Sequence, residues 1–254
     1  LDFSCAVFNG NGELVANAPH VPVHLGSMGE SVKTVIREKL SVMKPGSVYM
    51  LNAPYNGGTH LPDVTVVTPV FDEQGENILF YVGSRGHHAD IGGRTPGSSP
   101  PDSKHIDEEG VLIDNFLLVE DGRLREKETR ELLGSGKYPC RNVDQNMADL
   151  AAQIAANETG VNELQKMVQQ FGLDVVHGRQ GLFARHAGGI ADVQGEGHVL
   201  REFDVAEAVH DLRRHAFGRG LGAARPGLLG TAGEEIGIDR LGMEELRAPR
   251  HGAG

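Results

Sequence analysis

The sequence predicts a mixed α+β fold of the α/β class, in which an antiparallel-rich mixed sheet is flanked by helices. Short segments of β-branched and aromatic residues alternate with turn signals through the first half of the chain. Apolar residues recur at helical spacing over 28–40, and a helical pattern returns from Asn142. With 254 residues, the chain is long enough to bury a sizeable core.

The strands are expected at 2–8, 13–16, 48–51, 64–71, 78–83 and 110–113. Asn9-Gly10-Asn11-Gly12 predicts a hairpin between the first two strands, because Asn and Gly accept the positive φ angles of tight turns. A turn at 72–77 predicts a second hairpin between two strands rich in β-branched and apolar residues. The open ends of such a hairpin are adjacent, so residues that flank them are expected within side-chain reach of one another.

Three helices are expected, over 28–40, from 142 to near 157, and over 161–171 with Gly172 as the C-cap. The first helix is expected to follow a capping box, in which Ser27 is followed three residues later by Glu30. Pro19 and Pro22 predict an extended segment before this helix, because proline fixes φ and lacks an N–H. A turn pair is predicted over 116–119, Asp121-Gly122 and the residues from Arg123 onward.

The composition changes after Val176. Residues 177–254 contain ten Arg and no Lys, whereas residues 1–176 contain seven of each. The same segment has no Ser, Asn, Tyr or Cys, and a boundary between domains seldom removes four residue types at once. We therefore expect a partial domain over 1–176 and a tail of uncertain status over 177–254. Two interpretations of the tail stay open: a disordered segment rich in Arg, Gly and His, or a reading frame that shifts just after Val176.

The charge balance excludes several classes of partner. The formal net charge is -11 and the pI is near 5.5, which argues against nucleic acid or an anionic membrane surface. No apolar run is long enough to span a bilayer, and no signal-peptide pattern opens the sequence. Cys5 and Cys140 form no disulfide framework, which favours a cytoplasmic protein. The sequence opens on Leu1 within a strand, so we expect a fragment truncated at its N-terminus.

Two His/Asp pairs flank the hairpin expected around 72–77. His60 and Asp63 form an H-x-x-D pair just before it, and His87 and Asp90 repeat the spacing just after it. Imidazole and carboxylate ligands suit Zn, Mn or Fe, and they exclude a soft thiolate site. A divalent metal with an open coordination position would hold a water and lower its pKa toward neutral, and a nearby carboxylate would serve as general base. The alternative is that polar loops contain His and Asp without any metal.

No phosphate-binding motif is present. The sequence lacks G-x-x-x-x-G-K-[ST], and it lacks a G-x-G-x-x-G between a strand and a helix. A G-x-S-x-G nucleophile elbow is absent as well. Any nucleotide chemistry must therefore be supplied by another polypeptide or domain.

Five long motifs resemble the hydantoinase B/5-oxoprolinase family. They are L-D-F-S-C-A-V-F, N-A-P-H-V-P-V-H-L-G-S-M, N-A-P-Y-N-G-G-T-H-L-P-D, G-H-H-A-D-I-G-G and Y-P-C-R-N-V-D-Q-N-M-A-D-L-A-A-Q-I-A-A-N. The resemblance runs from Leu1 to about Val176, and the five motifs occur in the family's order. Where the composition changes, the resemblance stops.

The resemblance implies a B-type half that binds a divalent metal and opens a cyclic amide, or acts on a related carbonyl compound. A separate A-type half, in another subunit or fused in one chain, would bind ATP and Mg²⁺ and phosphorylate the substrate carbonyl. The metal ligands implied by the family are Asp2, His60, Asp63 and His87. Without the resemblance, Asp2 would be interpreted as a solvated carboxylate at the end of a strand.

The resemblance also implies roles around the metal. His24 and Asp90 are expected as catalytic residues, and His20, Asn56 and His88 as substrate contacts. The expected activity is ATP-dependent opening of a cyclic amide, of the 5-oxoproline or N-methylhydantoin type, in a hetero-oligomer with the A-type partner. Two alternatives stay open: a subunit of a ketone carboxylase of the same family, and a truncated fragment that is not catalytic.

Overall fold

A seven-stranded sheet organises the part of the chain that the computed structural model describes, residues 2–17 and 21–173. The strands are β1 (Phe3–Asn9), β2 (Leu14–Asn17), β3 (Val48–Leu51), β4 (Asp63–Phe71), β5 (Ile78–His87), β6 (Phe116–Glu120) and β7 (Arg123–Leu124). Their order in the sheet is β2-β1-β5-β4-β3-β6-β7, and every pairing is antiparallel. The predicted tail over 177–254 and the predicted substrate contact His20 lie outside the described residues.

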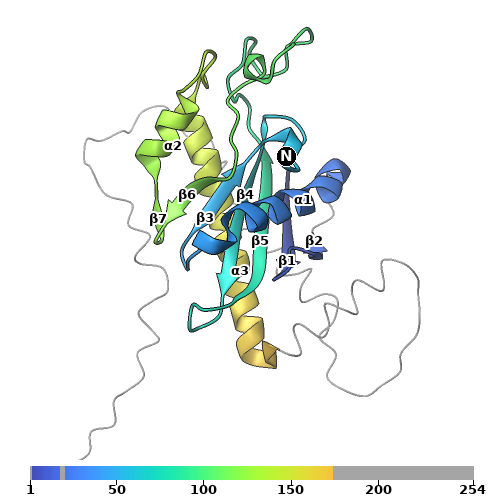
Figure 1. The fold of residues 1–254 in the computed structure, drawn as a ribbon, viewed down its shortest axis with the longest axis vertical. Coiled ribbons are helices and arrows are strands. Elements are labelled where there is room, and N and C mark those ends of the chain that lie inside the picture. The colour runs from blue at the N-terminus through green and yellow to red at the C-terminus, as the bar shows by residue number, and fades with distance from the viewer. Residues whose placement is uncertain (1, 18–20, 174–254) are drawn as a thin grey trace, which may run out of the picture.

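Helices cover both faces of this sheet, as Figure 1 shows. They are α1 (Pro22–Lys39), α2 (Glu126–Leu133) and α3 (Val143–Phe171), with single 3-10 turns at η1 (Leu40–Val42), η2 (Pro54–Asn56) and η3 (Ile106–Glu108). On one face, Met28 and Val32 of α1 pack with Phe8 and Val67. On the opposite face α3 contributes Met147, Leu150, Ile154, Ala156 and Leu164 to two clusters of buried side chains. Within the described ranges, no helix is long and apolar enough to cross a membrane.

The central hairpin of β4 and β5 confirms the predicted pairing. Its register runs from Asp63 opposite His87 to Phe71 opposite Ile78. At the turn, the Asp72 carboxylate accepts hydrogen bonds from the backbone N–H groups of Glu76 and Asn77. Because side chains alternate between the two faces of a strand, every second residue of each strand faces α1. β5 extends to His87, four residues beyond the predicted end, and so carries this histidine to the open end of the hairpin.

The prediction that Pro22 precludes a helix was wrong. Helix α1 begins at Pro22, and Val21 before it is extended. Proline is tolerated in the first helical turn, because its missing N–H would have no partner within the helix there. The helix therefore starts six residues earlier than the capping box indicated, and His24 lies within it instead of in a loop.

Three other expectations were wrong between residue 110 and the end of the described chain. Helix α3 is continuous through Asn157, where a helix end was predicted. The Asn157 amide donates to the Val66 carbonyl of the sheet, so it does not compete for the backbone groups of its own helix. Strands β6 and β7 and helix α2 occupy the segment from Phe116 onward in which a turn pair was predicted. Residues 110–113 form no strand, although the Ile113 carbonyl accepts the backbone N–H of Asn52.

Candidate metal site

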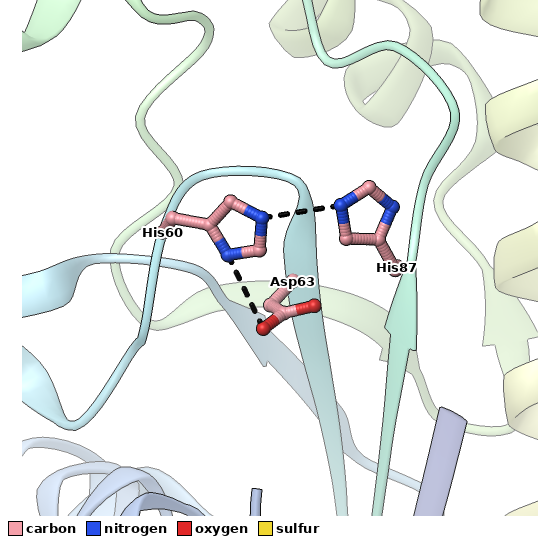
Figure 2. A group of neighbouring side chains, drawn as sticks. All are labelled: His60, Asp63 and His87. Carbon is pink, nitrogen blue, oxygen red and sulfur yellow. Dashed lines mark hydrogen bonds and ion pairs between the residues drawn. The ribbon is translucent and has the colours of Figure 1, made fainter. Parts of the chain in front are cut away.

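Three side chains meet at the open end of the β4–β5 hairpin: His60, Asp63 and His87 (Figure 2). Asp63 begins β4 and His87 ends β5, and the two are paired in the register of the strands. Residues directly opposite each other on antiparallel strands have Cβ atoms about 5 Å apart. His60 comes from the loop just before β4. One ligand atom from each residue lies within 4.8 Å of the others.

The two histidines face each other through their Nε2 atoms, which are 3.1 Å apart. Their ring centroids are 5.0 Å apart, and the rings are tilted by 43°. Two such nitrogens can share only one hydrogen, so this close approach calls for a proton or a cation between them. On a tetrahedral metal with metal–nitrogen bonds of about 2.0–2.1 Å, two ligand nitrogens are about 3.3 Å apart. The approach therefore fits two ligands of one ion.

Asp63 supplies the clearest sign of a missing partner. Its side chain is only 2% exposed, and its Oδ1 has no hydrogen-bond partner among the described residues. In Figure 2, the Asp63 oxygen that no dashed line joins to His60 lies on the side of His87. A buried polar atom without a partner costs about 1–3 kcal/mol. A divalent cation held by nitrogen and oxygen ligands would satisfy it, and this donor set suits Zn, Mn or Fe.

The other oxygen of Asp63, Oδ2, is crowded with donors. Thr59 donates its hydroxyl hydrogen to this oxygen, and His24 Nε2 and His60 Nδ1 lie 3.2 and 3.3 Å from it. Burial by itself would raise the pKa of Asp63. The hydrogen bonds from His24 and Thr59, with the nearby imidazoles, outweigh burial and lower the pKa from 3.8 to about 2. The carboxylate is therefore ionised and ready to bind a cation at neutral pH.

We expect this pKa to appear in the acid stability of the metal-free protein. The unfolded carboxylate binds its proton near pH 3.8 and the folded one only near pH 2, so the unfolded state binds more protons between these values. The stabilisation, about 2 kcal/mol, is complete above pH 4 and is lost as the pH falls toward 2. Denaturant titrations between pH 5 and 2 measure it. Asp63→Asn should lack this component, and an unchanged pH slope in that variant would contradict the assignment.

His24 holds Asp63 from the side of α1. Its ring is 1% exposed and lies between the Asp63 carboxylate and the hydroxyl of Ser4 on β1, which is 2.9 Å from Nδ1. Because a carboxylate only accepts, Nε2 carries the ring hydrogen, and Ser4 donates to Nδ1. One tautomer is thereby fixed. This arrangement orients Asp63, as hydrogen-bonded groups around a metal commonly orient its ligands.

Asp2 lies beside the three residues without joining the cluster. Its backbone carbonyl accepts the N–H of His87 at 2.9 Å, which ties the start of the chain to the end of β5. Its carboxylate is 54% exposed and lies 3.9 Å from His24 Nε2. Asp2 is not one of the three clustered residues, and its role as a fourth metal ligand stays a prediction.

A family model described as hydantoinase B/oxoprolinase matches residues 1–184. The chain belongs to the hydantoinase B/oxoprolinase family. The resemblance carried by the five sequence motifs is thus confirmed. A 5-oxoprolinase of Dictyostelium discoideum is 51% identical over 177 residues, which make up 70% of this chain and 14% of that protein. An uncharacterised protein of Schizosaccharomyces pombe is 44% identical over 219 residues, 84% of this chain and 17% of that protein.

A bacterial caprolactamase is similar in both sequence and structure. The β subunit of the Pseudomonas jessenii enzyme is 32% identical over 175 residues, 69% of this chain and 29% of that subunit. The crystal structure of an ATP-dependent caprolactamase from this organism superposes with a TM-score of 0.66 at 29% identity, covering 73% of this chain and 31% of that one. The antiparallel sheet with flanking helices is therefore a fold of the hydantoinase B/oxoprolinase family, and the predicted fold class is confirmed.

The extent of these matches bears on the domain boundary. This chain spans only 14% of the Dictyostelium 5-oxoprolinase, so it corresponds to a small part of such a protein. The family model matches as far as residue 184, and the match with the Schizosaccharomyces protein covers more of this chain than residues 1–176 contain, so similarity to known proteins extends past Val176. The division at Val176 and the two interpretations of the tail stay predictions.

Other candidates from the family motifs lie farther from the three ligands. His88 points to the opposite face of the sheet, where it is buried between Gln153 and Asn146 of α3 at 3.2 and 3.0 Å. Burial lowers the pKa of His88, against the effect of its hydrogen bond to Gln153. Asn56 donates its amide hydrogen to Asp114 at 2.8 Å. Substrate contacts by His88 and Asn56 stay predictions.

The Asp90 carboxylate binds Arg141 and does not join the three clustered residues. Its carboxylate accepts a hydrogen bond from Arg141 Nη1 at 2.7 Å and others from the backbone N–H groups of Gly92, Gly97 and Arg141. Burial by itself would raise the pKa of Asp90, but these donors hold it below its usual range. The spacing made the two H-x-x-D pairs look alike, but only His60 and Asp63 come together with His87. A catalytic role for Asp90 stays a prediction.

Sequence reasoning missed three residues that support the site: Ser4, Thr59 and Arg85. Ser4 and Thr59 contact the ring of His24 and the carboxylate of Asp63. Arg85 is fully buried two residues before His87. The sequence did contain a signal for Arg85. An arginine is unusual inside an apolar strand, and this one lies two residues from a candidate metal ligand, on the same face of the strand. For the two hydroxyl residues no sequence signal was available.

Proposed function

We propose that this chain carries the metal-binding site of an ATP-dependent cyclic amidase. The observation that carries the proposal is the cluster of His60, Asp63 and His87, in which a buried carboxylate oxygen lacks a partner. The named relatives support the substrate class, since 5-oxoprolinase and caprolactamase are both named for cyclic amides. The substrate would be a small cyclic amide of the 5-oxoproline or N-methylhydantoin type.

Each residue of the cluster would have a distinct part. His60 and His87 would contribute their Nε2 atoms and Asp63 its Oδ1, with Asp2 as a fourth ligand. A divalent Zn, Mn or Fe bound there would polarise a carbonyl oxygen and lower the pKa of a water. His24 keeps its hydrogen on Nε2 and holds Asp63 Oδ2, which would leave the other oxygen available to the ion. His87 is exposed and His60 half-exposed, so a substrate would approach from their side.

ATP chemistry would come from a partner. The sequence has no phosphate-cradling motif, and the Pseudomonas caprolactamase relative is named as a β subunit. We propose an A-type polypeptide or domain that binds ATP with Mg²⁺ and activates the amide carbonyl, in a hetero-oligomer with this chain. Both cysteines are free and buried, which agrees with a reducing cytoplasm.

The test is reconstitution with an A-type partner. Metal content is measured by mass spectrometry, and ring opening of 5-oxoproline and N-methylhydantoin is assayed with and without ATP. We expect about one divalent ion per chain and ring opening that depends on ATP. Incorporation of labelled bicarbonate into a small ketone would instead support the carboxylase alternative. Absence of both metal and turnover would support the non-catalytic fragment and overturn the proposal.

A further inference from the structure

Arg85 is a buried cation without a hydrogen-bonded carboxylate in the described part of the chain. Its side chain is 0% exposed. Nε donates to Thr65 Oγ1 at 2.7 Å, Nη1 donates to Ser27 Oγ, and Nη2 donates to Ser31 Oγ at 2.8 Å and to the Gly57 carbonyl at 2.9 Å. Burying a charge among neutral acceptors is costly, and well-packed apolar residues often replace buried charges at no loss of stability. Stability alone therefore gives no reason for an arginine here.

The position of Arg85 relates it to the metal site. In the β4–β5 register, Asp63 is opposite His87, and two residues farther along Thr65 is opposite Arg85. Side chains two residues apart on a strand share a face, so Arg85 and Thr65 lie directly behind the two ligands. Burial lowers the pKa of Arg85 to about 10, against the effect of the Asp63 carboxylate, so the guanidinium is charged at neutral pH.

The guanidinium joins two segments that meet at the site. Ser27 and Ser31 belong to α1, three and seven residues after His24, and so lie on the same side of that helix. The Gly57 carbonyl belongs to the loop that continues to Thr59 and His60. This carbonyl also accepts a hydrogen bond from the Ser31 hydroxyl at 2.8 Å, so Arg85 and Ser31 both bind the loop at the same atom.

We propose that Arg85 is a positioning residue for the metal site, whose buried guanidinium fixes the loop before β4 to α1. Because the loop carries Thr59 and His60 and α1 carries His24, this link would hold the three residues where His60 and Asp63 can bind a cation. The inference rests on the metal site proposed above and adds a residue that touches none of its three ligands. It also explains why the strand carries an arginine where an apolar residue would suffice for packing.

The experiment compares Arg85→Met with a matched control, Asn157→Ala. Asn157 is also buried and donates to β4, at Val66 O and Thr68 Oγ1, but from the α3 face of the sheet. Hydrogen exchange of peptides over 54–62 is measured in the metal-free chain, and zinc affinity is measured by competition with a chelator. For Arg85→Met we expect at least tenfold faster exchange and about 10–100-fold weaker zinc binding. For the control we expect a lower unfolding temperature with unchanged exchange over 54–62 and unchanged zinc affinity.

Arg85→Lys and Ser31→Ala keep the test decisive if Arg85→Met does not fold. Lysine supplies one ammonium group in place of the planar fork and should restore zinc affinity only in part. Ser31→Ala removes one of the links and should weaken zinc binding less than Arg85→Met. Wild-type exchange over 54–62 and wild-type zinc affinity in these variants would overturn the inference, as would equal losses in Asn157→Ala. If the unmodified chain bound no zinc, the proposed function would fail, while the exchange comparison would still decide the role of Arg85.

Discussion

Asp63→Ala is expected to abolish metal binding by this chain and, with the A-type partner present, ring opening as well. The substitution removes the one buried carboxylate of the cluster and the oxygen that lacks a partner. It also leaves His24 Nε2 and the Thr59 hydroxyl without their acceptor, so the two supporting residues lose their orientation. His60→Ala should have the same effect, because only one histidine would then remain opposite Asp63. Metal content and ATP-dependent turnover are the measurements.

Asp72→Ala is the matched control for this experiment. Asp72 is an exposed carboxylate at the turn of the same hairpin, at the end opposite to Asp63. Its replacement should lower stability modestly, because the turn loses hydrogen bonds, and should leave metal content unchanged. Asp63→Asn separates charge from shape, since it keeps the size of the side chain and should still lose most of the metal. Full metal content and turnover in Asp63→Ala would refute the site.

Gly57→Ala is expected to disrupt the loop that carries His60. Gly57 has φ +83°, and a Cβ placed there would overlap the backbone nitrogen of Ser31 in α1. The left-handed conformation costs a non-glycine residue about 1 kcal/mol or more, and the overlap adds about 1–3 kcal/mol because neither backbone segment moves freely. The loop should move away from α1 and take its histidine with it. Thermal unfolding and zinc affinity should therefore both decrease.

Gly136→Ala controls for the backbone conformation alone. Gly136 has φ +81°, nearly the same as Gly57, but a Cβ there would meet no atom within 4 Å. This variant should show the cost of the left-handed conformation without the overlap, and its zinc affinity should equal that of the unmodified chain. If the two variants lost equal stability and both bound zinc normally, close packing of the loop against α1 would have no part in forming the site.

The sequence alone predicted the elements closest to the site. Runs of β-branched and apolar residues predicted β4 and β5, and the turn at 72–77 predicted that their open ends meet. These local signals were sufficient because a hairpin has only one simple pairing, so His60, Asp63 and His87 could be expected together. The motifs identified the family because long polar loops with a fixed order of His, Asp and Gly are far more specific than composition.

Only the tertiary structure decided which polar residues serve the site. Spacing could not distinguish Asp63 from Asp90, since the difference lies in Arg141, which is distant in sequence and binds Asp90. The start of α1 at Pro22 and the continuity of α3 through Asn157 depend on packing against the sheet, which local propensity does not contain. Contacts across long sequence separations likewise brought Arg85 and His24 behind the ligands. Local chemistry thus determined the ligand types and the hairpin that carries them, whereas packing of distant segments determined how those ligands are held.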